Sequence, residues 1–245
     1  MRYKITIEYD GTKYVGWQRQ KEQKSVQEVI EKALEKAFNQ EIEITVSGRT
    51  DAGVHALGQV AHFDLDKNLN DFQMMMAINN NIPHEEDINI IKSEMVSDQF
   101  HSRFDAKMRH YQYKILNRKA PSSLNKNRAW YVPQNLDLSK MQEAAESLIG
   151  QHDFSSFRDK ECQSKSPIKT LNSIKIEKIG EIINLDFAAK SFLHHMVRNI
   201  VGTLCWVGKD KISVGEIKNI LAAKNRNLSG PNAPAHGLYL TKIEY

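Results

Sequence analysis

The order of apolar and polar positions along the 245 residues predicts alternating strands and helices. Residues 2–9 alternate between polar and apolar side chains, which is the period of a half-buried strand. Ser25-Val26-Gln27-Glu28 is a capping box, and apolar side chains recur at helical spacing from there to Phe38. The same patterns predict strands at 42–46, 58–64 and 88–92 and a helix at 72–78.

The second part of the chain repeats this order. Tyr111, Tyr113 and Ile115 alternate in a strand, and Gly180 lies in the turn of a predicted hairpin. The remaining predicted elements are a helix at 139–149 with Ser139 and Gln142 as its capping box, hairpin strands at 171–176 and 182–187, an apolar helix at 192–207, a helix at 213–224 with Ser213 and Glu216 as its box, and a strand at 238–243.

Both parts therefore follow the order β-α-β-β-α-β of the split βαβ, or ferredoxin-like, motif. We expect an α+β protein with two such halves, residues 1–105 and 106–245, whose antiparallel sheets join around a central cleft. The halves share no obvious sequence identity, so the repeat concerns architecture only. Long loops are expected at 118–128 and 151–167. The second of these carries Lys165 and further cations, so phosphate contact and an ordinary solvated loop are equally good interpretations.

Composition narrows the class of protein. The chain is 40% hydrophobic and 26% charged, and no apolar run approaches the roughly 18 residues of a membrane span. Its two cysteines, Cys162 and Cys205, form no Cys-x-x-Cys pair, which argues against a disulfide framework or a zinc finger. The alternating start does not resemble a signal peptide, so we expect a cytoplasmic protein. The net charge of +4 suits an anionic partner such as nucleic acid, but only weakly.

The segment 47–56 is the clearest candidate for chemistry. It follows a predicted strand and combines two glycines with a cation, a hydroxyl, a carboxylate and an imidazole. Glycines permit a tight turn and the close approach of a ligand. Arg49 is near enough in sequence to keep Asp51 ionised as a nucleophile or base. From these residues alone, a structural turn in which Asp51 caps amides and pairs with Arg49 is the favoured interpretation.

Residues 48–56, followed by Gln59-Val60-Ala61, resemble the signature of the TruA family of tRNA pseudouridine synthases. The resemblance continues along the whole chain. It includes Tyr9-Asp10-Gly11-Thr12, Gly16-Trp17-Gln18-Arg19-Gln20, Phe100-His101-Ser102-Arg103-Phe104, Arg109-His110-Tyr111-Gln112-Tyr113, residues 153–158, residues 192–202, and Gly237-Leu238-Tyr239-Leu240.

This resemblance implies an isomerase, without cofactor or metal, that converts uridine to pseudouridine at positions 38, 39 and 40 of the anticodon stem-loop of tRNA. The reaction breaks the N1–C1′ bond, turns the uracil and rejoins it through C5. By motif position Asp51 is the catalytic residue, whether it attacks C1′, adds to C6 or abstracts the 2′ proton. Because the target base must leave its stack, Arg49 is expected to fill the vacated space or to contact the adjacent phosphate.

The resemblance also implies roles for other residues. Tyr111 would stack on the flipped uracil or bond to it, although a core aromatic is the alternative. Arg198, a cation in an apolar helix, would pair with Asp51 or with another acid. One of Leu238 and Leu240, with a slight preference for Leu240, would pack against the uracil. The expected RNA contacts are Arg19, Arg109, Arg158 and Lys160. Family members are homodimers, and one tRNA is expected to reach both subunits.

Two other function classes compete with this one. A non-catalytic tRNA-binding or tRNA-folding protein would use the same scaffold, and a hydrolase would use Asp51 with His55 as acid and base. We expect no metal at His194-His195, because neighbours on a helix point about 100° apart and no cysteine or acid completes a site.

Overall fold

The computed structural model describes all 245 residues, which pack into two compact units. The first unit comprises Met1–Lys107 together with Tyr239–Tyr245, and the second comprises Met108–Leu238. Both combine helices with a mostly antiparallel sheet, so the predicted α+β class is confirmed. The two functional halves at 1–105 and 106–245, joined at a central cleft, stay a prediction. The sequence places the closing strand in the second half, whereas residues 239–245 pack with the first unit.

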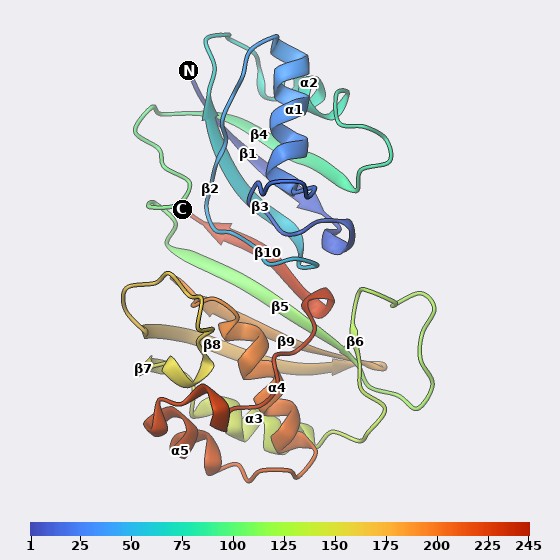
Figure 1. Ribbon diagram of the computed structural model, residues 1–245, viewed down its shortest axis with the longest axis vertical. Coiled ribbons are helices and arrows are strands. Elements are labelled where there is room, and N and C mark those ends of the chain that lie inside the picture. Colours follow the sequence, from blue (N-terminus) through green and yellow to red (C-terminus); the bar gives the residue numbers. More distant parts are fainter. The chain divides into compact units, whose positions relative to one another are not determined.

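The first unit has the strand order of a ferredoxin-like fold. Its elements are β1 (Arg2–Tyr9), α1 (Val26–Phe38), β2 (Thr45–Val46), β3 (His55–Asp64), α2 (Asp71–Asn79), β4 (Ile88–Val96) and β10 (Leu238–Glu244). Strand β1 pairs antiparallel with β4 on one side and with β3 on the other, and β2 pairs antiparallel with β3. Strand β10 runs parallel to β3, with Tyr239 opposite His55. Helix α1 lies in front of β1 and β3 in Figure 1.

Helix α1 shows how local chemistry forms an element of this unit. The Ser25 hydroxyl accepts the Glu28 N–H, and the Glu28 carboxylate pairs with Lys32 at 2.6 Å, four residues on. Such caps and pairs stabilise a helix by satisfying its free amides and by attraction along one face. The apolar face, including Ile30 and Leu34, is fully buried against the sheet core. The hydrophobic stripe read from the sequence therefore points inward, as predicted.

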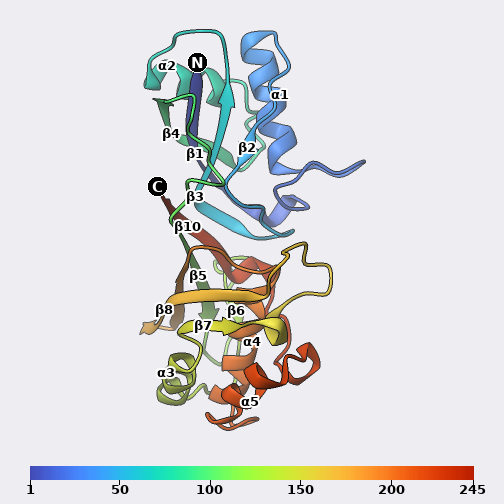
Figure 2. The ribbon, with the colours of Figure 1, turned by 90° about the vertical axis from the view of Figure 1, so that its left-hand side faces the viewer.

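The second unit is built around a four-stranded antiparallel sheet in the order β5-β9-β8-β7. Its elements are β5 (Met108–Leu116), β6 (Trp130–Tyr131), α3 (Leu138–Glu146), β7 (Gly150–Asp153), β8 (Ile168–Ile179), β9 (Ile182–Ala189), α4 (Met196–Gly208) and α5 (Glu216–Ala223). The helices gather on one side of this sheet (Figure 2). The β8–β9 hairpin turns at Gly180, whose φ of +60° confirms the predicted turn.

Several predicted boundaries are wrong at helix starts. The cap of α3 is Asp137, whose carboxylate accepts the Lys140 N–H, rather than Ser139. Helix α5 follows Gly215 without a side-chain cap, and Ser213 contributes only its backbone carbonyl to the Glu216 N–H. A carboxylate at a helix start gains from both the free amides and the helix dipole, which favours Asp137.

Strand lengths also differ from the sequence pattern. Strand β2 has two residues instead of five, while β3 begins at His55 and β4 continues to Val96. Pairing with β1 over most of their length, interrupted by a register shift in each, extends β3 and β4 beyond their apolar runs. No helix combines the length and the apolar character needed to cross a membrane.

Candidate functional site

Asp51 lies in the connection from β2 to β3, which we call the aspartate loop (residues 47–54). Its start is tied to β3: the Ser47 N–H donates to the Val60 carbonyl at 2.9 Å, and the Gln59 side-chain amide donates to the Gly48 carbonyl at 2.8 Å. Within the loop, the Val54 N–H donates to the Asp51 carbonyl at 3.2 Å. Local bonds thus close the turn around Asp51, whose side chain is half-buried.

A second segment, residues 10–17, is hydrogen-bonded to the aspartate loop through its backbone. The Trp17 N–H donates to the Thr50 carbonyl at 3.1 Å, and the Gly53 N–H donates to the Tyr14 carbonyl at 3.4 Å. Gly16 and Asp51 form an isolated antiparallel bridge. Two motifs that the resemblance quotes separately, around residues 10 and 50, therefore form one piece of structure.

Two glycines make this close approach possible. A Cβ on Gly16, whose φ is +109°, would lie 2.5 Å from the Thr50 carbonyl oxygen. A Cβ on Gly11 would lie 2.1 Å from the Val54 carbonyl oxygen. Both distances are far inside van der Waals contact, so only glycine fits at either position. Sequence reasoning stressed the glycines inside the loop and missed this role of the glycines outside it.

Buried polar side chains also support the aspartate loop. The Tyr9 hydroxyl lies 2.8 Å from the Thr50 hydroxyl, and both side chains are buried. The buried ring of His55 accepts the Gly11 N–H on Nδ1 at 3.0 Å and stacks on Tyr239 at 4.7 Å between centroids. His55 thus serves as part of the scaffold, which counts against the hydrolase interpretation that needed it as acid or base.

The other predicted residues of the first unit lie in different surroundings. Leu240 is almost fully buried on β10, opposite Ala56 on β3, directly after the aspartate loop. Arg49 is exposed. Arg19 donates to Glu31 of α1 at 2.5 Å, so its guanidinium is already engaged within the unit. Its contact with RNA stays a prediction.

Strand β5 of the second unit carries Arg109, Tyr111 and Tyr113. Tyr111 is half-buried and meets Phe192 edge-on at 5.1 Å between ring centroids. Tyr113 is fully buried and donates its hydroxyl to the Pro234 carbonyl at 2.7 Å, and burial raises the pKa of Tyr113 well above its usual value. Tyr113 is therefore the fully buried tyrosine of β5, and both roles considered for Tyr111 stay predictions. Arg109 donates to the Lys190 carbonyl.

Arg198 is in the first turn of α4 and is held by a segment that we call the strap (Ser229–Pro234). Its Nε donates to the Ala233 carbonyl at 2.7 Å, and the Ala233 N–H donates back to the Arg198 carbonyl at 3.2 Å. A Cβ on Gly202 would lie 1.8 Å from the Pro231 carbonyl oxygen, so the strap touches the helix backbone there. The strap thereby directs the half-buried Arg198 side chain.

Arg226 fixes the strap to α4. It donates to Asn199 Oδ1 at 2.8 Å and to the Gly230 carbonyl at 2.9 Å, and burial lowers the pKa of this guanidinium. Sequence reasoning missed this network. Asn199, a polar residue inside an apolar helix, was the available signal, because buried polar groups need partners.

The prediction for His194 and His195 is wrong in its geometry. Both residues precede α4, His195 has a left-handed φ of 61°, and their rings lie 4.0 Å apart. An acid is also present: Asp159 lies 2.7 Å from His195 Nδ1 and 3.8 Å from His194 Nδ1. Partial burial raises the pKa of Asp159, but the Glu161 N–H and His195 outweigh it and leave that pKa below its usual value. The ionised carboxylate anchors the long loop beside α4.

The basic residues of that loop are placed as follows. Arg158 donates from Nη2 to the Cys162 carbonyl at 2.7 Å and to the Ser164 carbonyl at 2.8 Å, while Lys160 is exposed. The ion pair of Arg198 with Asp51 and the contact of Tyr111 with uracil involve both units and stay predictions.

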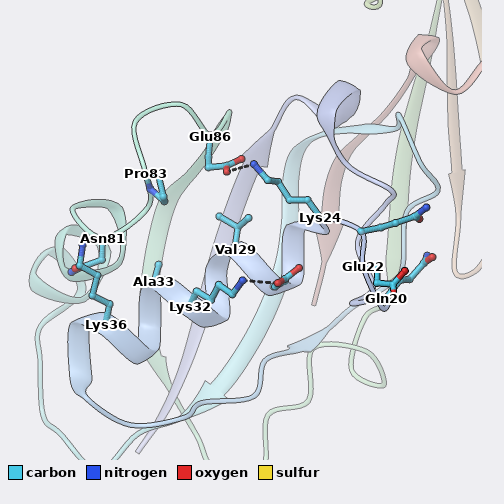
Figure 3. Close-up of a pocket in the computed structure, with 12 residues that line it drawn as sticks. Gln20, Glu22, Lys24, Val29, Lys32, Ala33, Lys36, Asn81, Pro83 and Glu86 are labelled. Carbon is cyan, nitrogen blue, oxygen red and sulfur yellow. Dashed lines mark hydrogen bonds and ion pairs between the residues drawn. The ribbon is translucent and has the colours of Figure 1, made fainter.

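A groove of about 470 Å³ lies elsewhere in the first unit, between α1 and residues 81–86 (Figure 3). Its lining contains three lysines and three glutamates, and Lys24–Glu86 and Lys32–Glu28 form ion pairs at 2.5 and 2.6 Å. No predicted site residue lines it, and four of its six charged side chains are paired with one another. We assign it no role in the chemistry.

Comparison with known proteins agrees with the motifs. A family model described as tRNA pseudouridine synthase matches residues 5–105 and 144–245. Three curated proteins named tRNA pseudouridine synthase A align with 100% of this chain and 100% of their own length. They come from Ehrlichia chaffeensis, with 52% identity, Ehrlichia canis, with 50%, and Anaplasma phagocytophilum, with 47%. The similarity includes the aspartate loop and α4.

Proposed function

The chain belongs to the family of tRNA pseudouridine synthases, which are isomerases, and on this premise we propose that it converts uridine to pseudouridine at positions 38, 39 and 40 of the anticodon stem-loop of tRNA. We propose Asp51 as the catalytic residue, acting without a cofactor. The observation that carries the assignment is the aspartate loop, which is held by hydrogen bonds from β3 on one side and from residues 10–17 on the other.

The chemistry explains why a rigid carboxylate is needed. Uridine and pseudouridine are isomers: the N1–C1′ bond breaks, a C5–C1′ bond forms, N1 takes up a proton and C5 loses one. While the uracil is detached, a group must stabilise C1′ or the ring. A carboxylate serves as nucleophile at C1′, as nucleophile at C6 or as base at the 2′ position, and each role requires a fixed distance to the sugar or base.

The contacts of the loop support this role for Asp51. Bonds from Trp17, Gly53 and Val54 fix the backbone on either side of Asp51, and buried Tyr9 and His55 bond to Thr50 and Gly11. A group that is held in position before the substrate arrives needs no reorganisation during the reaction. A turn that served only to connect two strands would not need two glycines pressed against its carbonyls.

Four further residues are proposed to act on the flipped nucleotide. Tyr111 stacks on or bonds to the uracil, Leu240 packs against it, and Arg198 pairs with Asp51. Arg49, which is exposed, takes the vacated place of the base or contacts the adjacent phosphate. Flipping costs a few kcal/mol, and these contacts offset it.

We also propose a cytoplasmic homodimer in which one tRNA reaches both subunits. Distributed contacts from Arg19, Arg109, Arg158 and Lys160 suit such an extended ligand. Phosphate contacts release counterions, so binding is expected to weaken steeply with salt.

The test uses tRNA that carries tritium at C5 of uridine. Formation of the C5–C1′ bond expels this tritium into water, so release measures the proposed reaction directly. Wild type is expected to release it, while Asp51→Ala and Asp51→Asn release none and bind tRNA as tightly as wild type. Residual turnover above about one part in a thousand in Asp51→Asn would contradict its catalytic role.

The other outcomes separate the competing functions. Tight tRNA binding without release by wild type would identify a non-catalytic tRNA-binding protein. Release by both wild type and Asp51→Ala would keep the isomerase but exclude Asp51. Free uracil or phosphate in the supernatant would identify a hydrolase, because an isomerase liberates neither.

A further inference from the structure

Phe104 is exposed in a way that core packing does not explain. It lies in the turn after β4, which we call the aromatic turn (His101–Asp105), and 71% of its surface is open to solvent. The His101 ring lies beside it, 4.3 Å away between centroids, and the Arg103 guanidinium lies 5.7 Å from its ring centre. An aromatic ring, an imidazole and a guanidinium thus form one small outward surface.

The aromatic turn is rigid in its own backbone. The N–H groups of Arg103 and Phe104 both donate to His101 Nδ1, at 3.2 and 3.4 Å. The His101 N–H donates to the Asp105 carboxylate at 2.8 Å, and the Asp105 N–H donates back to the His101 carbonyl at 3.0 Å. The only acid of the turn is therefore directed at a backbone amide.

The turn is also anchored to the body of the first unit through Ser102, which is fully buried. The Ser102 hydroxyl donates to the Thr45 carbonyl at 2.8 Å, and its carbonyl accepts the Tyr245 hydroxyl at 2.8 Å. The Ser102 N–H donates to His62 Nδ1 at 3.2 Å. These bonds of Ser102 fix the backbone two residues before Phe104, so little freedom is lost when a ligand stacks on the ring.

We propose that the aromatic turn is a stacking platform for an unpaired nucleobase of the RNA substrate. This inference rests on the proposed function, which supplies the RNA. Proteins bind single-stranded nucleotides by stacking bases on exposed aromatic rings and guanidinium planes, with cations nearby for the phosphates. A docking site for another protein is the competing use of an exposed phenylalanine, but the adjoining Arg103 and His101 favour an anionic, planar ligand.

The experiment compares side chains at position 104 in the inactive Asp51→Asn background, so that the tRNA stays unmodified. Filter binding gives the Kd of a tRNA transcript for Phe104→Ala, Phe104→Leu and Phe104→Tyr. Removing a stacking aromatic is expected to raise Kd by about 5- to 150-fold. Leucine should behave like alanine, because it is apolar but cannot stack, and tyrosine should restore binding. Phe72→Ala is the matched control, since Phe72 is 67% exposed but lies on α2, outside the turn.

Each alternative to the stacking platform predicts a different experimental result. Wild-type affinity in Phe104→Ala, or wild-type affinity in Phe104→Leu, would overturn the platform. A change in molar mass on sedimentation of Phe104→Ala, with unchanged tRNA affinity, would identify a protein interface instead. Equal losses in Phe72→Ala would show a non-specific effect. Failure of the proposed function appears separately, as absence of tritium release from the wild type, and leaves the binding series readable.

Discussion

Substitution of Gly16 by alanine tests whether the position of the aspartate loop limits the reaction. Gly16 does not belong to the loop and carries no chemical group. Its only role in our interpretation is to let residues 10–17 approach the Thr50 and Asp51 backbone. A loss of activity in Gly16→Ala would therefore report on geometry alone.

The structure gives the size of the perturbation. The new Cβ would lie 2.5 Å from the Thr50 carbonyl oxygen and 3.1 Å from the carbonyl carbon of Asp51. Relieving this overlap requires the two segments to separate by about 0.5–1 Å, given normal contact distances. A misplacement of about 1 Å at an active site lowers a rate by about 100-fold, so we expect the rate to fall about 10- to 100-fold. The φ of +109° adds about 1–3 kcal/mol of backbone strain, which lowers Tm by about 2–12 °C.

The assay is single-turnover tritium release with enzyme in excess over tRNA, together with filter binding and thermal unfolding. Binding should change by less than about threefold, because phosphate contacts carry most of the affinity. Gly180→Ala is the matched control. Gly180 also has a positive φ, +60°, but no atom lies within 4 Å of the added Cβ. It should lose some stability and keep the wild-type rate.

Two results would refute this reasoning. One is a wild-type release rate in Gly16→Ala despite a lower Tm, which would mean that the loop tolerates the displacement. The other is an equal rate loss in Gly180→Ala, which would trace the effect to general destabilisation.

Three further predictions follow from other parts of the molecule. Gly202→Ala should lower Tm by about 2–12 °C through overpacking against the strap, although alanine in a helix normally stabilises by about 1 kcal/mol relative to glycine. Tritium release by this variant should also slow, because the strap directs the side chain of Arg198. Arg158→Ala and Lys160→Ala should each lower the slope of log Kd against log salt by about 1, while the rate of tritium release from bound tRNA stays unchanged. Only Arg158→Ala should also lower Tm, because the Arg158 side chain bonds to two carbonyls of the loop. Burial raises the pKa of Cys205 to about 12, whereas an unfolded thiol ionises near ~8.5, so the unfolded state loses its proton first. The free energy of unfolding should therefore fall as pH rises from ~8.5 toward about 12, and this fall should be smaller in Cys205→Ala by up to about 1.4 kcal/mol per pH unit.

Each of these has a contradicting result. A higher Tm in Gly202→Ala would mean that the strap yields easily. An unchanged salt slope in both loop variants would remove this loop from the RNA interface. The same pH dependence of the free energy of unfolding in wild type and Cys205→Ala between pH 8 and 11 would show that the folded thiol ionises as readily as the unfolded one.

The sequence by itself determined much of the local structure. Helix α1, the hairpin at Gly180 and the order of helices and strands along residues 1–105 follow from periodicity and turn residues, whose information lies within a few neighbouring positions. It also determined which loop to examine, because Asp51 and the surrounding residue types are contiguous. The resemblance of that loop to a family is a property of the sequence alone.

Only the tertiary structure decided how distant segments meet. The cap of α3, the start of α4 after His195, and the burial of Tyr113 rather than Tyr111 depend on how the chain enters each element and on what packs against it. The contact of Gly16 with Thr50 joins positions more than thirty residues apart, and the strap joins Gly202 to Pro231. No local sequence pattern predicts such contacts. A glycine needed for a turn and a glycine needed for close contact with a distant backbone have the same sequence signal, and only the folded structure distinguishes them.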